Sequence, residues 1–517
     1  MTFEIVFVLL SLLGMMAALI ADKMRPGMVL FSVVVLFLCA GILTPKEMLE
    51  GFSNKGMITV ALLFLVSEGI RQSGTLGQVI KKLLPQGKTT VFKAQLRILP
   101  VVAFISAFLN NTPVVVIFAP IIKHWAKSVK LPATKFLIPL SYVTILGGIC
   151  TLIGTSTNLV VHGMILEAGY EGFTMFELGK VGIFIAIAGI IYLFVFSKRL
   201  LPDARPDTAV PDEEVEEGEK LHRVEAVLGA RFPGINKKLS DFNFQRHYGA
   251  EVKEIKTRNG QRYVDNLEDV VLREGDTLVV MADDTFIPTW GESSVFVLLT
   301  NGNEPDTSGK KKRWLALLLL VLMIVGATVG ELPATKEMFP DIKLDMFFFV
   351  CITTIIMAWT NIFPARKYTK YISWDILITI ACAFAISKAM VNSGVADCVA
   401  GFIIGLSDDY GPHVLLAILF VITNLFTELI TNNAAAALAF PLALSISAQL
   451  GVSPTPFFVV ICMAASASFS TPIGYQTNLI VQGIGNYKFT DFVRIGLPLN
   501  IITFLISVIL IPLIWNF

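Results

Sequence analysis

The sequence predicts an all-α polytopic membrane protein with a small α+β domain inserted near its middle. Of the 517 residues, 54% are hydrophobic and only 16% are charged, whereas a soluble domain usually carries about 25% charge. Many apolar residues lie in runs long enough to cross a lipid bilayer. One long polar stretch, residues 201–312, separates two sets of such runs that follow the same order of lengths.

The apolar runs define the expected membrane segments. Those of the first half, residues 1–200, cover 4–22, 27–44, 57–72, 95–122, 135–168 and 179–198. Those of the second half, residues 313–517, cover 314–331, 344–363, 375–392, 411–446, 456–486 and 494–516. The first run has no basic residue before it and Lys23 and Arg25 after it, the reverse of a signal peptide. We therefore expect it to be the first membrane helix.

Short motifs recur between the halves and predict an internal duplication. The stretch 151–163 matches 471–483, so that Asn158 and Asn478 lie 478 − 158 = 320 positions apart. Ser73-Gly74 matches Ser393-Gly394 at the same separation, and Asn110-Asn111 matches Thr431-Asn432 at 321. Unrelated hydrophobic helices rarely keep such a register over several motifs.

Two segments in each half have polar centres. The runs 95–122 and 411–446 contain Asn110-Asn111-Thr112 and Thr431-Asn432-Asn433, and each is too short for two full spans. We expect re-entrant helical hairpins there, and broken helices at 135–168 and 456–486, because interrupted backbone is tolerated at membrane depth only inside protein or beside water. Each half then crosses the membrane an odd number of times, which predicts inverted repeats.

Basic residues indicate the orientation. Lysine and arginine gather in cytoplasmic loops, and with the N-terminus outside most of them fall on the cytoplasmic side, including the run Lys310 to Arg313. The outside loops then hold only a few, namely Lys46, Lys55, Lys336 and Lys343. We therefore expect a multi-pass cell-membrane protein, with both termini outside and residues 201–312 in the cytoplasm.

The polar stretch 201–312 reads as a small α+β domain. It begins with an acidic linker from Asp203 to Glu219. Alternating patterns predict strands at 222–229, 250–257 and 276–282, with a hairpin turn at Asn259-Gly260. A short helix is expected near 239–247.

Several function classes are excluded by what the sequence lacks. It has no GxxxxGK[ST] phosphate loop for ATP-driven pumping, and its six cysteines form no CxxC pair or zinc pattern. A net charge of +1 suggests no nucleic acid partner. No nucleophile–base or metal constellation indicates an enzyme.

Polar residues at the hairpin tips and in the broken helices are the candidate site. Their side chains and freed carbonyl groups suit a monovalent cation, and N–H groups at half-helix N-termini suit an anion. The alternative is that Asn and Thr only join helices, a bond worth about 0.6 kcal/mol. Four such segments in matched positions favour a binding site.

With these motifs, both halves resemble the divalent anion/sodium symporter family of the ion-transporter superfamily of elevator carriers. The family has a Ser-Asn-Thr tip on each hairpin; the central Asn is kept here, and both Ser residues are replaced. The resemblance implies an elevator-type homodimer in the lipid bilayer, with co-transported sodium and no organic cofactor. The replaced Ser residues leave proton coupling as an alternative.

The resemblance also implies site residues. The anion would contact Asn110, Asn111, Thr112, Thr431, Asn432 and Asn433. One sodium ion would lie between each tip and the unwound loop of its own half, and the implied ligands are Ser106, Asn110, Asn111, Gly154, Thr155, Thr157, Asn158, Thr427, Thr431, Asn432, Gly474, Thr477 and Asn478.

Ionisable residues inside the membrane segments are functional candidates in their own right. Glu428, one turn before the second tip, is either a cation ligand or proton carrier, or a carboxylate that fixes the hairpin by hydrogen bonds. Glu68 and Lys388 occupy matching positions with opposite charge; we expect a structural ion pair, and a role in coupling is the alternative. His162 is expected to be a packed, neutral residue.

The polar insert resembles a regulator-of-K⁺-conductance C-terminal (RCK-C, TrkA-C-like) domain. The matching residues run from Ala230 to Phe244 and from Val270 to Val280. Such domains commonly dimerise, and some bind small nucleotide ligands such as cyclic di-AMP. The alternative is a purely dimerising or stabilising domain.

The sequence thus predicts a secondary active transporter for a small divalent anion, coupled to sodium. Sulfate is the first candidate and a C4-dicarboxylate the second. A cation channel gated by the insert is a third reading, but no TVGYG-type filter is present.

Overall fold

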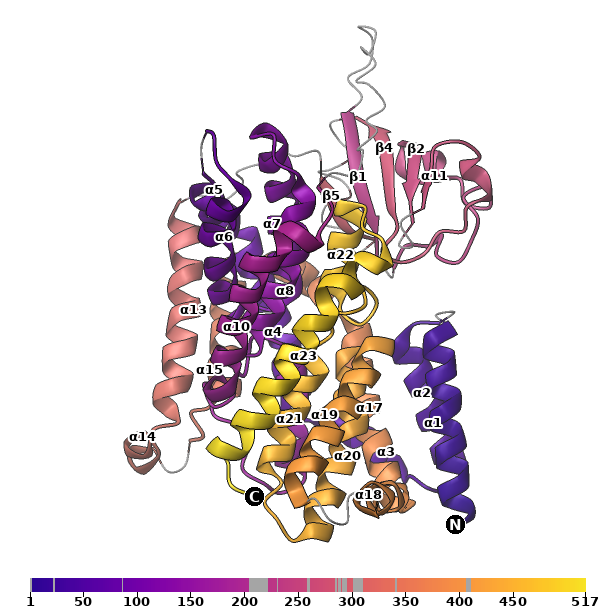
Figure 1. Cartoon of the computed structure of the whole chain (residues 1–517), viewed down its shortest axis with the longest axis vertical. Coiled ribbons are helices and arrows are strands. Elements are labelled where there is room, and N and C mark those ends of the chain that lie inside the picture. Colours follow the sequence, from indigo (N-terminus) through magenta and orange to yellow (C-terminus); the bar gives the residue numbers. More distant parts are fainter. Residues whose placement is uncertain are drawn as a thin grey trace, which may run out of the picture.

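The apolar runs become helices at nearly the predicted places in the computed structural model of the chain (Figure 1). The structure describes residues 2–21, 24–85, 87–203, 222–229, 231–257, 261–283, 286, 290, 295–300, 310–339, 342–405 and 411–517. Among these residues, eight helices are long and apolar enough to cross a membrane. The chain is a polytopic membrane protein.

The helices of the two halves follow a similar order, except that the second half has one additional short helix, α14. In the first half they are α1 (Phe3–Ala21), α2 (Pro26–Cys39), α3 (Pro45–Glu50), α4 (Lys55–Gln72), α5 (Thr75–Leu83), α6 (Val91–Ser106), α7 (Asn111–Ser128), α8 (Leu137–Gly148), α9 (Ser156–Glu167) and α10 (Gly179–Leu200). In the second half they are α13 (Lys310–Gly330), α14 (Pro333–Met338), α15 (Met346–Trp359), α16 (Tyr368–Tyr371), α17 (Trp374–Asn392), α18 (Val395–Gly405), α19 (Gly411–Leu429), α20 (Asn432–Leu450), α21 (Thr455–Ser466), α22 (Gln476–Gly485) and α23 (Phe489–Ile514).

The polar centres interrupt helices as expected. The run 95–122 forms α6 and α7, which break at the first tip, and the run 411–446 forms α19 and α20, which break at the second. In Figure 1 the first hairpin lies toward the end that carries the sheet domain, and the second lies toward the opposite end. The runs 135–168 and 456–486 form the broken pairs α8–α9 and α21–α22.

The short helices α5 and α18 were not predicted. Each follows a glycine with positive φ, Gly74 at 71° and Gly394 at 76°, a conformation that glycine adopts without strain. The matching Ser-Gly pairs of the sequence are therefore the turns into these two helices.

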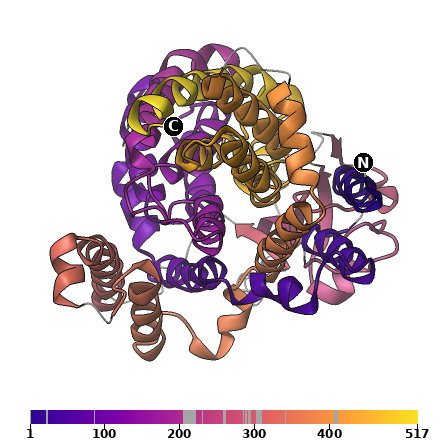
Figure 2. The same cartoon turned by 90° about the horizontal axis from the view of Figure 1, so that it is seen from below.

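The helices pack in two groups, which meet where α17 packs on α20 and α4 packs on α9. In the first, which holds both hairpins and both broken helices, α6 packs on α8, α7 on α22, α9 on α20, α19 on α21 and α10 on α23. In the second, α2 packs on α17, and α15 packs on α4 and α13. Seen from the end opposite the sheet domain, α1–α2 and α13–α15 lie at different sides of the first group (Figure 2).

The insert folds as a five-stranded antiparallel sheet of order β3-β2-β4-β1-β5. Its elements are β1 (His222–Leu228), α11 (Phe244–Tyr248), β2 (Glu251–Lys256), β3 (Arg262–Tyr263), β4 (Thr277–Ala282) and β5 (Phe296–Thr300). The predicted helix is thus shorter than 239–247, and β3 and β5 are additional strands. The Asn259-Gly260 turn, and the acidic linker beyond Asp203, fall outside the described residues.

One face of the sheet forms the core of the insert, and the other is docked on the helices. Along β1, Val224, Ala226 and Leu228 join the core of the insert, whereas Val227 packs with the membrane helices. This alternation follows from the two-residue period of a strand. The sheet therefore has no free second face along β1.

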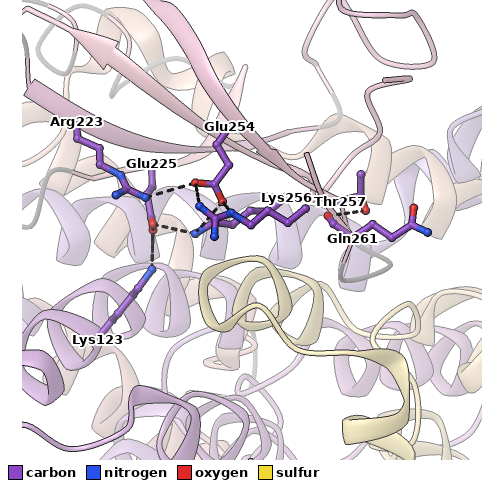
Figure 3. Close-up of polar contacts among 8 residues, drawn as sticks. Lys123, Arg223, Glu225, Glu254, Lys256, Thr257 and Gln261 are labelled. Atoms are coloured by element: carbon purple, nitrogen blue, oxygen red, sulfur yellow. Dashed lines mark hydrogen bonds and ion pairs between the residues drawn. The ribbon is translucent and has the colours of Figure 1, made fainter. Parts of the chain in front are cut away.

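The docked face contacts α7 of the first hairpin and α22 of the second broken pair. The Lys123 ammonium group on α7 donates to both carboxylate oxygens of Glu225, at 3.0 and 2.9 Å (Figure 3). On α22, Gly483 lies against the Thr277 hydroxyl group of β4, where even a methyl group would not fit. Both chain termini lie at the other end of the helical body (Figure 1).

Candidate functional site

Four helices begin close together in the first group of helices. They are α7, α9, α20 and α22, and the residues that precede them are Asn110, Thr155, Thr431 and Tyr475. None of these four residues caps its helix with a side-chain hydrogen bond. The first-turn N–H groups of a helix carry partial positive charge. The arrangement therefore collects hydrogen-bond donors and positive potential without a basic side chain.

The first tip is held against the unwound loop of its own half. The Ser106 hydroxyl group donates to Asn111 Oδ1 at 2.7 Å, and the Asn111 amide lies next to Gly148, which also contacts the Gly154 carbonyl group. The Thr151 hydroxyl group donates to the Ala107 carbonyl oxygen. Three of the predicted ligands, Ser106, Asn111 and Gly154, are therefore together.

The second tip is attached in a similar way. The Thr471 hydroxyl group donates to the Glu428 carbonyl oxygen at 3.0 Å, as Thr151 does to Ala107 in the first half. Gly474 lies against Ser468 and the Thr427 carbonyl group, so no side chain would fit there. The Thr427 hydroxyl group donates to the Ala465 carbonyl oxygen at 2.6 Å. This differs from the first half, where the corresponding Ser106 hydroxyl group donates to Asn111 of its own tip.

Each tip also contacts the unwound loop of the other half. The Thr112 hydroxyl group donates to Gln476 Oε1 at 3.3 Å. Asn433 Oδ1 accepts from the Ser156 and Thr157 hydroxyl groups at 3.1 and 3.4 Å. Thr112 corresponds to Asn433 and Ser156 to Gln476 in the sequence register, so the two contacts are equivalent. These contacts between the halves are additional to those expected from the sequence, which predicts contact of each tip with the loop of its own half.

Tyr475 connects the two tips. Asn111 Nδ2 donates to its hydroxyl group at 2.7 Å, and the Thr155 hydroxyl group lies 2.9 Å from it. The side chain of Asn432 also lies near the Tyr475 hydroxyl group. Tyr475 is therefore the residue around which Asn111, Asn432 and Thr155 meet.

Asn158 and Asn478 make equivalent hydrogen bonds. Asn158 Nδ2 donates to the carbonyl oxygens of Gly148 and Thr151, at 3.5 and 2.9 Å. Asn478 Nδ2 donates to those of Ser468 and Thr471, at 2.9 and 3.2 Å. Each amide therefore closes the unwound loop that precedes its helix.

The oxygens of the predicted sodium ligands suit a hard monovalent cation. Asn158 Oδ1 is buried and has no hydrogen-bond partner in the described part of the chain, and the Thr431 hydroxyl oxygen is in the same state. Asn478 Oδ1 and the Thr477 hydroxyl oxygen instead accept from Ser141 of α8, at 2.7 and 2.9 Å. Neutral oxygens with spare lone pairs can replace the hydration shell of sodium.

Glu428 is engaged by hydrogen bonds, as one of its two readings predicted. Its Oε1 accepts from the Ser470 N–H group at 2.8 Å and from Asn500 Nδ2 at 2.7 Å. These bonds link the second hairpin to its unwound loop and to α23.

The expected ion pair between Glu68 and Lys388 is wrong. Glu68 accepts from Arg71 at 2.6 and 2.7 Å, and from Gln72 of the same helix at 2.6 Å. Lys388 is exposed on α17. An arginine three residues away on the same helix is a nearer partner than any residue of the other half. His162 is packed, as predicted, and its Nδ1 has no described hydrogen-bond partner.

A small pocket adjoins the first tip. It lies between α4 and the tip, and its polar residues are Ser67, Asn110 and Ser156. The remaining wall is apolar, formed by Val60, Leu63, Val66, Phe108, Leu109, Ile153 and Leu159.

Three residues of this arrangement were not selected from the sequence. They are Ser156, Tyr475 and Gln476, all in the unwound loops. The signal was present, because Thr155 and Tyr475 are 320 positions apart, as are Ser156 and Gln476. Thr155 and Tyr475, which occupy matching positions of the two unwound loops, lie 2.9 Å apart through their hydroxyl groups. The two loops therefore cross at these matching residues.

Comparisons with known proteins give a consistent result. The model of a family described as citrate transporter matches residues 16–447 and 337–517. An uncharacterized transporter of Synechocystis is 29% identical over 569 aligned positions, which cover 94% of this chain and 93% of the relative. An uncharacterized transporter of Escherichia coli is 27% identical, with 99% and 100% covered. A probable sodium/sulfate cotransporter of Chlamydomonas reinhardtii is 34% identical over 54% of this chain and 31% of the relative.

Proposed function

The chain belongs to the citrate transporter family, and on this premise we propose that it is a secondary active transporter that imports a small divalent anion together with sodium. Sulfate is the first candidate. The similarity to a probable sodium/sulfate cotransporter supports both the cation and the anion. The observation that carries the proposal is the meeting of four uncapped helix N-termini at the two tips.

The charge of this arrangement matches a divalent anion. Each helix N-terminus is equivalent to roughly half an elementary charge, so four together offer about two positive charges. Asn110, Asn111, Thr112, Thr431, Asn432 and Asn433 are the proposed anion contacts.

Sodium would complete the site in each half. The proposed ligands in the first half are Ser106, Asn111, Gly154 and Asn158, with Asn110, Thr155 and Thr157 beside them. In the second half they are Thr427, Thr431, Asn432, Gly474, Thr477 and Asn478. Two cations beside the tips would favour anion binding through their charge. Sodium binding and anion binding would thereby be coupled, so that the sodium gradient drives anion uptake.

The wider architecture is part of the same proposal. The halves act as inverted repeats, and the helix group that holds the hairpins moves as an elevator against the second group in a homodimer. The insert, as an RCK-C-like cytoplasmic domain, dimerises or binds a nucleotide ligand. The position of both termini opposite the sheet domain supports the proposed orientation, with both termini outside.

A C4-dicarboxylate is the second candidate, because the family is described by a carboxylate substrate. The discriminating experiment uses purified protein in liposomes, with an inward sodium gradient or choline in its place. Radiolabelled sulfate uptake is competed with thiosulfate, phosphate, succinate and citrate. We expect sulfate uptake that requires sodium; uptake competed only by succinate and citrate would favour the second candidate.

Variants at the two tips test the site. Asn111→Ala and Asn432→Ala should each abolish uptake while the protein stays folded and keeps its elution volume in size-exclusion chromatography. Asn392→Ala is the matched control, because Asn392 bonds Ile42 and Glu47 at the end of α17. Normal uptake by both tip variants would contradict the site.

A further inference from the structure

Glu428 is the acidic residue nearest to the second tip, and its described partners are neutral. Two of them, the Ser470 N–H group and Asn500 Nδ2, bond Oε1. The other carboxylate oxygen, Oε2, accepts a long hydrogen bond of 3.5 Å from the Ser468 hydroxyl group, and Thr471 also lies within reach of the carboxylate. A charged carboxylate at membrane depth without a basic partner is costly unless it takes up a proton or a cation binds to it. Oε2 is the oxygen that remains for such a cation.

The surroundings of Glu428 have no equivalent in the first half. In the register of the two halves, Glu428 corresponds to Ala107 (428 − 107 = 321), Ser468 to Gly148 and Ser470 to Cys150. An acidic and two hydroxyl-bearing side chains thus replace an alanine, a glycine and a cysteine. The backbone contacts of the two tips are otherwise equivalent, as Thr151 with Ala107 and Thr471 with Glu428 show. The added polarity is therefore specific to the second half.

A second oxygen points to a ligand at the same place. Asn500 is 7% exposed, and its Oδ1 has no hydrogen-bond partner among the described residues. Its Nδ2 donates to Glu428 Oε1 and to the Ser470 hydroxyl group, at 2.7 and 2.8 Å. Because Oδ1 and Nδ2 belong to one amide group, Asn500 Oδ1 lies within about 5 Å of Glu428 Oε1. Carboxylate, amide and hydroxyl oxygens together form a donor set for a hard cation.

The carboxylate is also connected to the second unwound loop. The Ser468 hydroxyl group lies 3.3 Å from the Thr427 carbonyl oxygen as well as near Glu428 Oε2. Gly474 packs on both Ser468 and the Thr427 carbonyl group. A cation at Thr427 and Gly474 would thus be separated from the carboxylate by one hydroxyl group.

We propose that Glu428, with Asn500 and Ser468, supplies the negative charge for the monovalent cation bound at the second tip, so that the two halves bind sodium with unequal affinity. The proposal rests on the sodium coupling proposed above and adds which half binds sodium more tightly. In the first half, neutral oxygens alone would hold the cation.

The test measures sodium binding apart from transport. Thermal unfolding of the purified full chain is followed while sodium chloride replaces choline chloride at constant ionic strength and pH. We expect Glu428→Gln to raise the sodium concentration of half-maximal stabilisation about tenfold, since a charge a few ångströms away is lost. Glu428→Asp keeps the charge and should have a smaller effect.

Glu68→Gln is the matched control, because Glu68 is a membrane carboxylate bound by Arg71. It should leave the sodium midpoint unchanged. An unchanged midpoint in Glu428→Gln would overturn the proposal, whether or not uptake falls. If the wild-type chain itself shows no sodium-dependent stabilisation or uptake, the proposed function fails first, and the two failures are thereby distinguished.

Discussion

Asn111 and Asn432 lie on opposite hairpins and approach the same side chain: Asn111 Nδ2 donates to the Tyr475 hydroxyl group at 2.7 Å, and the Asn432 side chain lies near that group. They occupy matching places in the two halves, at the first residue of α7 and of α20. The two tips therefore meet at a residue of the second unwound loop. Movement of the first tip away from this loop must break the bond from Asn111 to the hydroxyl group.

Removing the Tyr475 hydroxyl group should impair the site without changing its shape. In Tyr475→Phe the ring is kept, but Asn111 Nδ2 and the Thr155 hydroxyl group lose a partner. A polar group left without its partner costs about 1 to 3 kcal/mol. We expect a lower melting temperature and at least tenfold weaker half-saturation by the anion in liposome uptake.

Tyr170→Phe is the control for this change, because Tyr170 is 45% exposed after α9. It should leave both measurements unchanged. Anion affinity that is the same in Tyr475→Phe and in the wild type would show that the hydroxyl group does not position the tips.

The membrane fold could be predicted from the sequence because hydropathy and polar interruptions act locally. A run of apolar residues must form a helix in lipid, and Asn110-Asn111 or Gly154-Thr155 marks the place where that helix breaks. The same local reasoning found α8–α9 and α21–α22 as broken pairs. The turns at Gly74 and Gly394 were found as matching motifs, but the short helices after them were not.

The tertiary pairings could not be predicted, because sequence distance does not reveal which elements cross. Glu68 was paired with Lys388 through their matching positions, whereas Arg71 lies one turn away on the same helix. Tyr475 was part of a recognised motif, but its role depends on how the two halves meet. The docking of the sheet on α7 and α22 depends on the same information.

The ion pair between Lys123 and Glu225 should hold the sheet domain on α7. Both side chains are mostly buried, with 21% and 16% exposed, and removing one partner of a buried pair costs about 3 to 5 kcal/mol. We expect Lys123→Glu to lower the melting temperature by placing two carboxylates together, and the double variant with Glu225→Gln, which removes this repulsion without placing a lysine beside Lys256, to recover part of the loss. Lys127→Glu makes the same charge change at an exposed position of α7 and should have little effect.

Acid should weaken this docking. Burial alone would raise the pKa of Glu225, but attraction to Lys123 and Lys256 outweighs it and lowers the pKa from its ordinary value of 4.5 to about 2. A carboxyl group whose folded-state pKa is depressed stabilises the folded state above its unfolded pKa, and this contribution is lost as the pH falls. The loss should therefore develop between about pH 4.5 and pH 2, with an amplitude of about 3 kcal/mol.

The measurement compares unfolding of the wild-type chain and Glu225→Gln over this pH range. The difference between their free energies of unfolding should shrink as the pH falls, because the glutamine cannot titrate. A difference that stays constant from pH 6 to pH 2.5 would contradict the assigned pKa.

Gly474 should not tolerate a side chain, because the unwound loop passes directly over the second hairpin. A methyl group at this position would meet the Ser468 hydroxyl group and the Thr427 carbonyl oxygen, and overpacking of this kind costs about 1 to 3 kcal/mol. We expect Gly474→Ala to displace the loop from Thr427 and to reduce sodium-dependent uptake at least tenfold. Gly401→Ala is the control, since a methyl group there meets only Gln449 Oε1 at 3.7 Å. If Gly474→Ala kept wild-type uptake and sodium dependence, the close contact between the loop and the hairpin would not be needed for transport.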